Sequence, residues 1–145
     1  MIDHMSDECA FCGIVGGVEK ASIVWQDELT MAFIDHRQFH AGHTLVIPRK
    51  HFADVRELDE PTGAALMASV VRIARAVAAA FPNDGLSVWH SIGEGADQEV
   101  PHLHFHVHPR MIGDGLLRVY PSPASISDKS VRDSYAARLR SHLPG

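Results

Sequence analysis

Residues 101 to 108 read Pro-His-Leu-His-Phe-His-Val-His, so that histidine and apolar side chains alternate without a break. In a β-strand, residues two apart share a face and lie about 6.5–7 Å from one another. The alternation therefore predicts a strand over His102–His108, which Pro109 would end, with a row of imidazoles on one face. Leu103, Phe105 and Val107 would point to the core. Ordinary solvent faces carry Lys, Glu and Thr, so this row indicates a functional site.

Two kinds of chemistry fit such a row. Histidines at alternate strand positions can bind one metal ion that keeps an open coordination position for hydrolysis. Alternatively, one neutral imidazole is a nucleophile toward phosphorus, and its neighbours hold the phosphate. The spacing of the histidines does not decide between these two.

The rest of the chain predicts an α+β domain. Apolar residues at three- and four-residue spacing from Leu66 to Phe81 indicate one helix of about 20 residues, with Asp59 as its N-cap and Pro61 in its first turn. Ser127 is a candidate cap for a short C-terminal helix, in which Val131, Tyr135 and Leu139 form a packing stripe. Further strands are expected at 22–25, 30–35, 44–48 and 86–92, the last in a hairpin with 102–108. Strands, one long helix and a returning hairpin together indicate an antiparallel sheet.

Composition limits the classes of function. The chain has 145 residues, the length of one domain, and a formal net charge of −5, which argues against a nucleic acid polymer as partner. No signal peptide is expected in Met1–Glu8, and Arg72 and Arg75 interrupt the longest apolar run, so no membrane span is expected either. A cytoplasmic protein is therefore expected. The 11 histidines stand out.

The histidine stretch resembles the signature of the histidine-triad (HIT) superfamily, His-φ-His-φ-His-φ-φ, where φ is apolar. Other segments resemble the same family in the same order. They are Cys9-Ala10-Phe11-Cys12-Gly13-Ile14-Val15, Ala32-Phe33-Ile34-Asp35, Gly42-His43-Thr44-Leu45-Val46-Ile47-Pro48 and Gln98-Glu99-Val100. The resemblance covers about residues 8–115. It implies a single HIT-like domain over 1–145, with 116–145 as a C-terminal appendage, and a five-stranded antiparallel sheet.

The resemblance implies nucleotidyl transfer. The middle histidine of the triad, His104, would attack the α-phosphorus of a purine nucleotide, and water would then cleave the nucleotidyl-histidine. His106 would donate to phosphate oxygens as charge builds up, and His43 would orient or polarise the triad. The plausible substrates are nucleoside phosphoramidates and dinucleoside polyphosphates. The family also forms two-fold dimers through the long helix and an edge strand, so a homodimer is expected.

Family positions also suggest residues that bind the substrate. Asp35 would accept the ribose hydroxyls, Phe11 and Ile14 are candidates for the base pocket, and Gln98 would contact the phosphate or the leaving group. Ser91, also placed in the substrate site, stands where the family commonly has Asn. Asp97 stands where it commonly has Gly, and His108 occupies a position that is normally apolar. These departures bear on substrate preference and rate.

Cys9-x-x-Cys12 has three interpretations: a redox motif, half of a structural zinc site, or two structural thiols. Some HIT branches complete a zinc site with a histidine after the Val-Ile-Pro strand and with the first triad histidine. The resemblance therefore implies the set Cys9, Cys12, His51 and His102. Such a zinc would be structural, with no cofactor required for chemistry.

Two other functions stay open. One is a nucleotide-binding regulatory module with little turnover, which Ser91 and Asp97 would suit. The other is a zinc-dependent metallohydrolase with its metal on the triad.

Overall fold

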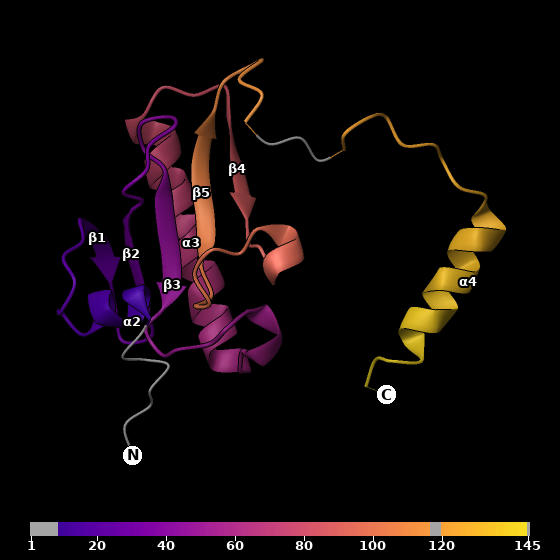
Figure 1. Cartoon of the computed structure of the whole chain (residues 1–145), viewed down its shortest axis with the longest axis horizontal. Coiled ribbons are helices and arrows are strands. Elements are labelled where there is room, and N and C mark those ends of the chain that lie inside the picture. Colours follow the sequence, from indigo (N-terminus) through magenta and orange to yellow (C-terminus); the bar gives the residue numbers. More distant parts are fainter. Residues whose placement is uncertain (1–8, 117–119, 145) are drawn as a thin grey trace. The chain divides into compact units, whose positions relative to one another are not determined.

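Five antiparallel strands form one sheet in the order β1-β2-β3-β5-β4 (Figure 1). The strands are β1 (Ile23–Gln26), β2 (Thr30–Ile34), β3 (Thr44–Pro48), β4 (Gly85–Trp89) and β5 (Phe105–Arg110). This computed structural model describes residues 9–116 and 120–144. The sheet confirms the α+β class and the antiparallel topology. Met1–Glu8, the segment in which no signal peptide is expected, lies outside the described residues.

The long helix α3 (Glu60–Ala80) covers one face of the sheet. It begins as predicted: the Asp59 carboxylate accepts from the Thr62 backbone N–H at 2.8 Å, and Pro61 lies in the first turn. Its buried apolar residues are Leu66, Val70, Ile73 and Val77, which pack on Ala32, Val46, Leu103 and Val107. Among the described residues, α3 alone is long and apolar enough to cross a membrane by length and composition. Because one face of α3 packs on the sheet, its buried apolar residues belong to the hydrophobic core.

The strand predicted over His102–His108 is wrong at both ends, since β5 covers Phe105–Arg110. β5 begins at Phe105 because the preceding segment turns away: the Leu103 N–H donates to the Phe52 carbonyl at 2.7 Å, on the chain that follows β3. The strand also continues through Pro109, which pairs with Leu86 beyond the last residue that β3 covers. A proline N–H is not needed there for the ladder to β3. The preceding strand, β4, ends at Trp89 rather than at residue 92.

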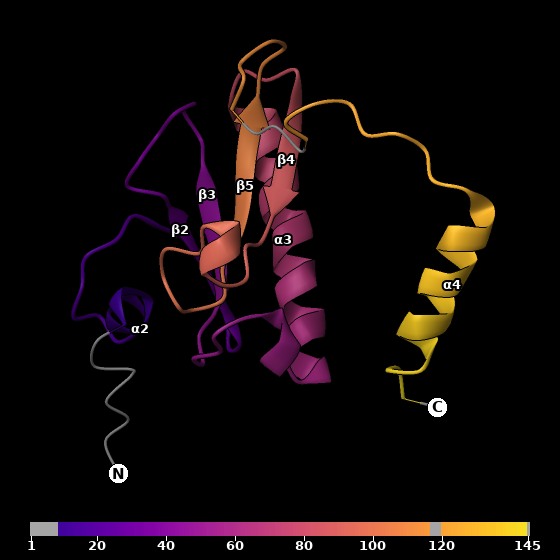
Figure 2. The same cartoon turned by 45° about the vertical axis from the view of Figure 1, so that its right-hand side comes forward.

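A short helix, α2 (Ala10–Val15), lies on the sheet face opposite α3 (Figure 2). The Cys9 sulfur caps it by accepting from the Cys12 N–H at 3.4 Å. Phe11 anchors the helix in a second apolar cluster with Met31, Phe33, Leu45 and Ile47. Six residues are too few for helical periodicity to indicate such an element, so the sequence pattern does not predict it. Two 3-10 turns lie in the connecting loops: η1 (Val55–Glu57) between β3 and α3, and η2 (Glu94–Ala96) between β4 and β5.

The chain divides into residues 1–114 and residues 115–145. In the second unit, α4 (Lys129–Arg140) confirms the predicted C-terminal helix, although Asp128 rather than Ser127 is its N-cap residue. The stripe of Val131, Tyr135 and Leu139, expected to pack, is exposed. The boundary between a domain core and an appendage stays a prediction.

Gly42 is where the backbone most clearly requires glycine, with φ of +110° and an added Cβ at 2.6 Å from Cδ2 of Phe81. Gly42→Ala is expected to lower the free energy of unfolding by about 2 kcal/mol, through a left-handed backbone and a clash with a ring. Urea denaturation followed by tryptophan fluorescence measures this. Gly85→Ala is the control, because its Cβ meets nothing within 4 Å. Equal midpoints for the two variants would contradict the explanation.

Candidate active site

The imidazoles of the triad segment lie on the face of the sheet opposite α3. His106 pairs in register with Leu45, which belongs to the apolar cluster on the α2 side. Leu103 and Val107 lie in the cluster under α3. The sidedness predicted from the alternation is therefore right, even though the strand itself begins at Phe105.

His104 is held as a neutral imidazole with one ring nitrogen available. It is 5% exposed, and its Nδ1 lies 2.7 Å from the His102 carbonyl oxygen. A carbonyl only accepts, so Nδ1 carries the proton and Nε2 keeps its lone pair. Burial lowers the pKa of His104, and the His102 carbonyl and the Asp35 carboxylate oppose that shift in part. At neutral pH this ring can act as a nucleophile.

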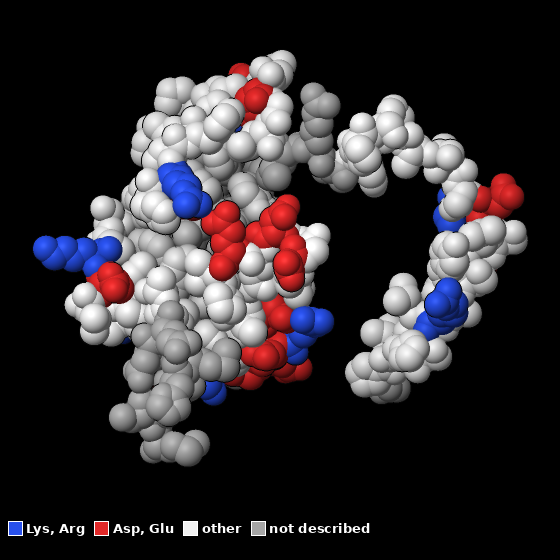
Figure 3. Space-filling view, in the orientation of Figure 1, with Lys and Arg blue, Asp and Glu red and all other residues white. Residues whose placement is uncertain are grey.

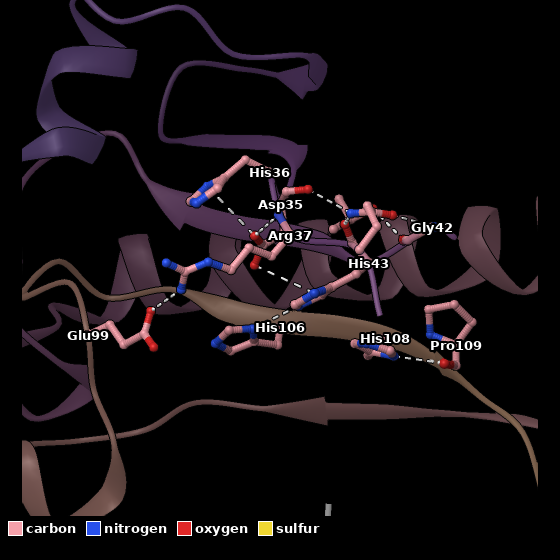
Figure 4. Close-up of polar contacts among 11 residues, drawn as sticks. Asp35, His36, Arg37, Gly42, His43, Glu99, His106, His108 and Pro109 are labelled. Carbon is pink, nitrogen blue, oxygen red and sulfur yellow. Dashed lines mark hydrogen bonds and ion pairs between the residues drawn. The ribbon is translucent and has the colours of Figure 1, made fainter. Parts of the chain in front are cut away.

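His43 and His106 form a pair beside it. The Nε2 of His43 lies 2.9 Å from Nδ1 of His106, and the other nitrogen of His43 lies 3.5 Å from an Asp35 carboxylate oxygen (Figure 4). Burial lowers the pKa of His43 against the raising effect of Asp35. Burial, followed by the neighbouring histidines, lowers the pKa of His106 to about 3. The pair is therefore neutral at neutral pH and can accept a proton when negative charge approaches.

Two further residues shape the site, and no sequence motif singles them out. Trp89 stacks on His106 with ring centroids 4.3 Å apart and planes 5° apart. These two residues are cross-strand partners in the β4–β5 register, so only the hairpin register could have revealed the contact. The Gln38 amide donates to the carbonyls of Asp35 and His43 at 2.7 and 2.9 Å. It thereby fixes the loop that carries both side chains.

The loop between β4 and β5 is closed by Gln98. Its amide oxygen accepts from the Gly93 N–H at 2.8 Å, and its amide nitrogen donates to the Ala53 carbonyl at 2.8 Å. The Gln98 side chain thus holds the loop, and its contact with a phosphate stays a prediction. Ser91 is half-buried near the start of this loop. Asp97 has φ of 62°, a left-handed conformation that favours glycine.

Exposed carboxylates belong to the same loop: those of Glu94, Asp97 and Glu99. Glu99 makes an exposed ion pair with Arg37 at 3.1 Å. Figure 3 shows acidic side chains gathered near the middle of this face. The loop that carries Gln98, the predicted phosphate contact, therefore has exposed negative charge.

Of the base-pocket candidates, Phe11 lies beside His104. Its ring meets the His104 ring edge-on at 5.1 Å and the Phe33 ring at 5.3 Å. Ile14 is half-buried against the same apolar cluster. Both residues come from α2, so this helix forms one wall beside His104.

The four residues proposed as metal ligands do come together. The Cys12 sulfur lies 3.2 Å from Nδ1 of His51 and 3.5 Å from Nδ1 of His102, and the Cys9 sulfur also lies 3.5 Å from the latter. All four ligand atoms lie within 4.8 Å of one another. Sulfur and nitrogen ligands of one tetrahedral zinc ion stand about 3.5 Å apart. The Nε2–H of His102 donates to the Pro48 carbonyl at 2.9 Å, which leaves Nδ1 for a metal.

A second group, made of Asp35, His43 and His106, also has its candidate ligand atoms within 4.8 Å of one another. There, however, the nitrogens of the two histidines face each other in a hydrogen bond.

Comparisons with known proteins agree with this geometry. The family model described as HIT domain matches residues 17–112. "Protein hit" of Bacillus subtilis is 36% identical over 143 residues, which cover 95% of this chain and 99% of that protein. The crystal structure of a member of the HIT family from Bacillus subtilis superposes with a TM-score of 0.88 at 33% identity, over 94% of this chain and 98% of that one. The protein named adenylylsulfatase HINT3, of Arabidopsis thaliana, is 28% identical over 112 residues, which cover 77% of this chain and 57% of that protein.

The neutral, buried histidines predict how stability depends on pH. The ordinary histidine pKa is 6.5, and that of His106 falls to about 3 in the folded chain. The unfolded chain therefore binds more protons below pH 6.5, and the stability that His106 contributes is complete above this pH and is lost as the pH falls toward 3. His106 is expected to lower the free energy of unfolding by about 1.4 kcal/mol per pH unit in this window, and the other buried histidines, whose pKa is also lowered, act in the same direction.

Thermal unfolding between about pH 7.5 and 4.5 measures the effect. His106→Asn should show a smaller loss of Tm over the same range, with His142→Asn as the control on an exposed histidine. A Tm that is unchanged between the two ends would contradict the neutral state of these rings.

Proposed function

This chain belongs to the HIT domain family, and from that premise we propose that it is a nucleotide phosphohydrolase or nucleotidyl transferase that works through a nucleotidyl-histidine. Family membership supports a role in nucleotide binding or hydrolysis. The observation that carries the finer proposal is the hydrogen bond from Nδ1 of His104 to the His102 carbonyl. This bond leaves a neutral nitrogen lone pair on a buried ring beside two further imidazoles.

The proposed reaction has two steps. In the first, Nε2 of His104 forms a bond to the α-phosphorus while the bond from phosphorus to the leaving group breaks, and the leaving group departs with the bonding electron pair and takes up a proton. In the second, water attacks the same phosphorus and loses a proton, and the phosphorus–nitrogen bond breaks. The products are a nucleoside monophosphate and the original neutral His104.

His106 and His43 stabilise the charge that builds up on the phosphoryl oxygens. A neutral pair that takes up one proton in the substrate complex would present an N–H donor from His106 to a phosphoryl oxygen. Asp35, 14% exposed at the side chain and 3.5 Å from Nδ1 of His43, would orient His43 and accept the ribose hydroxyls. Phe11 and Ile14 are the proposed contacts of a purine base.

The acidic loop bears on the leaving group. Dinucleoside polyphosphates release a polyanion, which the exposed carboxylates of Glu94 and Asp97 would repel. Phosphoramidates release an amine instead, which such a loop tolerates. Among the proposed substrates, the charge of this loop favours phosphoramidates. The Arabidopsis relative, an adenylylsulfatase by name, is consistent with attack at the phosphorus of an adenylyl group.

We also propose a structural zinc ion held by Cys9, Cys12, His51 and His102, whose ligand distances suit a tetrahedral site. When bound, zinc would supply a cross-link between α2 and the segment that leads into β5. Burial lowers the pKa of His102 to about 4, so protons compete little for its ligand nitrogen at neutral pH. The chemistry at His104 would need no metal.

A cytoplasmic homodimer remains part of the proposal. β4 is an edge strand of the sheet, and Val88 on it is 45% exposed. Met67 and Val71 on α3 are 51% and 40% exposed. These apolar residues suit the helix-and-edge contact expected for the family.

His104→Ala is expected to lower the turnover of adenosine and guanosine phosphoramidates by at least about 10⁴-fold, because no other ring replaces the nucleophile. Nucleotide affinity should change by less than about threefold, since the ribose and base contacts remain. The measurement is a turnover panel that includes dinucleoside polyphosphates, with calorimetry for binding of the monophosphate. Phosphoramidates should be the better substrates.

Trapping after an acid-free quench separates the alternatives. A transient adenylyl group on His104 supports the mechanism, and its absence together with negligible turnover by the wild type indicates the binding module. Undiminished turnover by His104→Ala would exclude the covalent mechanism.

Cys12→Ser is expected to lower the zinc content, from about one ion per chain, and to lower Tm by several degrees. The same loss of Tm should follow chelation of the wild type, because the metal cross-links two segments of the fold. Metal analysis and thermal unfolding measure both effects, with His142→Asn as the control. Chelation that abolishes turnover while Tm stays the same would indicate a catalytic metal instead.

A further inference from the structure

His108 is a buried imidazole that the proposed reaction does not use. It is 1% exposed, and its Nδ1–H donates to the Pro109 carbonyl at 2.7 Å (Figure 4). Because a carbonyl only accepts, Nδ1 keeps its proton and Nε2 is the nitrogen that can take up another. A buried polar ring at a position that the family pattern fills with an apolar residue calls for a role.

His108 lies directly behind the catalytic pair. Its ring centroid is 4.4 Å from that of His43, and His43 in turn stacks on His106 at 5.1 Å. Trp89 lies within 5.9 Å of each of these three rings. His43 is thus enclosed between two imidazoles and an indole, so its position and its protonation depend on both histidine neighbours.

The far side of His108 is held by a polar network. The His40 ring lies 5.6 Å from it, and Nε2 of His40 lies 3.0 Å from an Asp114 carboxylate oxygen. The same carboxylate, 4% exposed, accepts a two-pronged contact from the Arg110 guanidinium. Arg110 also donates to the Ser87 hydroxyl on β4 at 2.9 Å. These contacts hold the groups around His108 in fixed places.

We propose that His108 is a positioning residue of the histidine site, which competes with the His43–His106 pair for a proton and so adds to the effect of burial in holding down the proton affinity of that pair until a phosphate binds. This inference rests on the proposed function, because it assigns the pair the role of receiving a proton in the substrate complex. His108 itself contacts no reacting atom and acts through His43.

Electrostatics supports the competition. Two imidazolium ions with ring centres 4.4 Å apart in a buried site repel each other strongly, so a proton on His108 disfavours one on His43. Burial comes first among the causes that lower the pKa of His43 and of His106, and His108 adds to the shift in both cases. The pKa of His108 is itself lowered by burial, while Asp114 acts in the opposite direction.

The charged and titratable groups facing this set come from several elements. Asp35 follows β2, His40 lies in the loop before β3, His90 follows β4, His104 precedes β5, and Arg110 and Asp114 lie at and beyond its end. Asp35 favours a proton on His43, and His104 and His90 disfavour one on the pair. His108 itself packs on the His43 ring at 4.4 Å, and it has no place in the proposed substrate contacts.

The consequence for catalysis is one of timing. A pair that carried a proton in the absence of substrate would attract any small anion and would bring no new stabilisation at the transition state. A pair that stays neutral takes up its proton when the phosphate charge is present, and the N–H donor then forms where charge develops.

The test uses two variants that cannot take up a proton. His108→Asn keeps the donor to the Pro109 carbonyl but leaves space for water, and His108→Leu fills the space with an apolar group of similar size. His142→Asn, on an exposed histidine just beyond the end of α4, is the matched control. Imidazole NMR titrations of the zinc-loaded protein report the protonation of His43 and His106, and the pH profile of kcat/KM reports the reaction.

In both His108 variants the pair is expected to take up its proton at a pH higher by about half a unit, an increase of about threefold in proton affinity. The acid limb of kcat/KM should move in the same direction, while the control leaves both unchanged. A shift in His108→Asn alone would mean that entering water is the cause, and that outcome, or no shift in either variant, overturns the proposal. If the wild type shows no turnover, the proposed function fails, and the NMR titrations still decide the role of His108.

Discussion

The hydrogen bond from Nδ1–H of His104 to the carbonyl oxygen of His102, 2.7 Å long, is the contact on which the site depends. It fixes the tautomer of the proposed nucleophile, and it does so from the backbone of a proposed metal ligand. The same short segment also makes the Leu103 contact with the Phe52 carbonyl. The backbone path of residues 102–104 therefore sets three features: the tautomer of His104, the position of the proposed ligand His102, and the start of β5.

Burial of several imidazoles is the cost of this arrangement, and hydrogen bonds offset much of it. A buried ring that stays neutral needs one donor and one acceptor partner to avoid a desolvation penalty. His102 donates to Pro48, His108 donates to Pro109, and His43 pairs with His106. Backbone carbonyls thus assign tautomers to the outer rings, and the central pair keeps the capacity to change its protonation.

The sequence predicts those parts of the fold in which apolar residues recur at a regular spacing and one face of the element packs on the core. α3 follows its apolar spacing because one face of it lies on the sheet, and the sidedness of the triad segment follows from alternation. The beginning of β5, the helix α2 and the roles of Trp89 and Gln38 depend on contacts between distant segments, such as the Trp89–His106 register. No local pattern carries that information, and the residues of the metal group were assigned only through the resemblance to a family.

The residues that depart from the family pattern lie around the centre of the proposed site and not within it. The residues proposed to perform and orient the chemistry, His104, His106, His43 and Asp35, all match the family. Asp97 and His108 do not match it: Asp97 lies in the loop between β4 and β5 that carries Gln98, and His108 lies behind the His43–His106 pair. Asp97 even keeps a left-handed backbone that glycine would adopt without strain. Under the proposed reaction, a centre that matches the family pattern would keep the family's chemistry, and departures around it would alter the leaving-group preference and the proton affinity of the pair, because nearby charges act on both quantities.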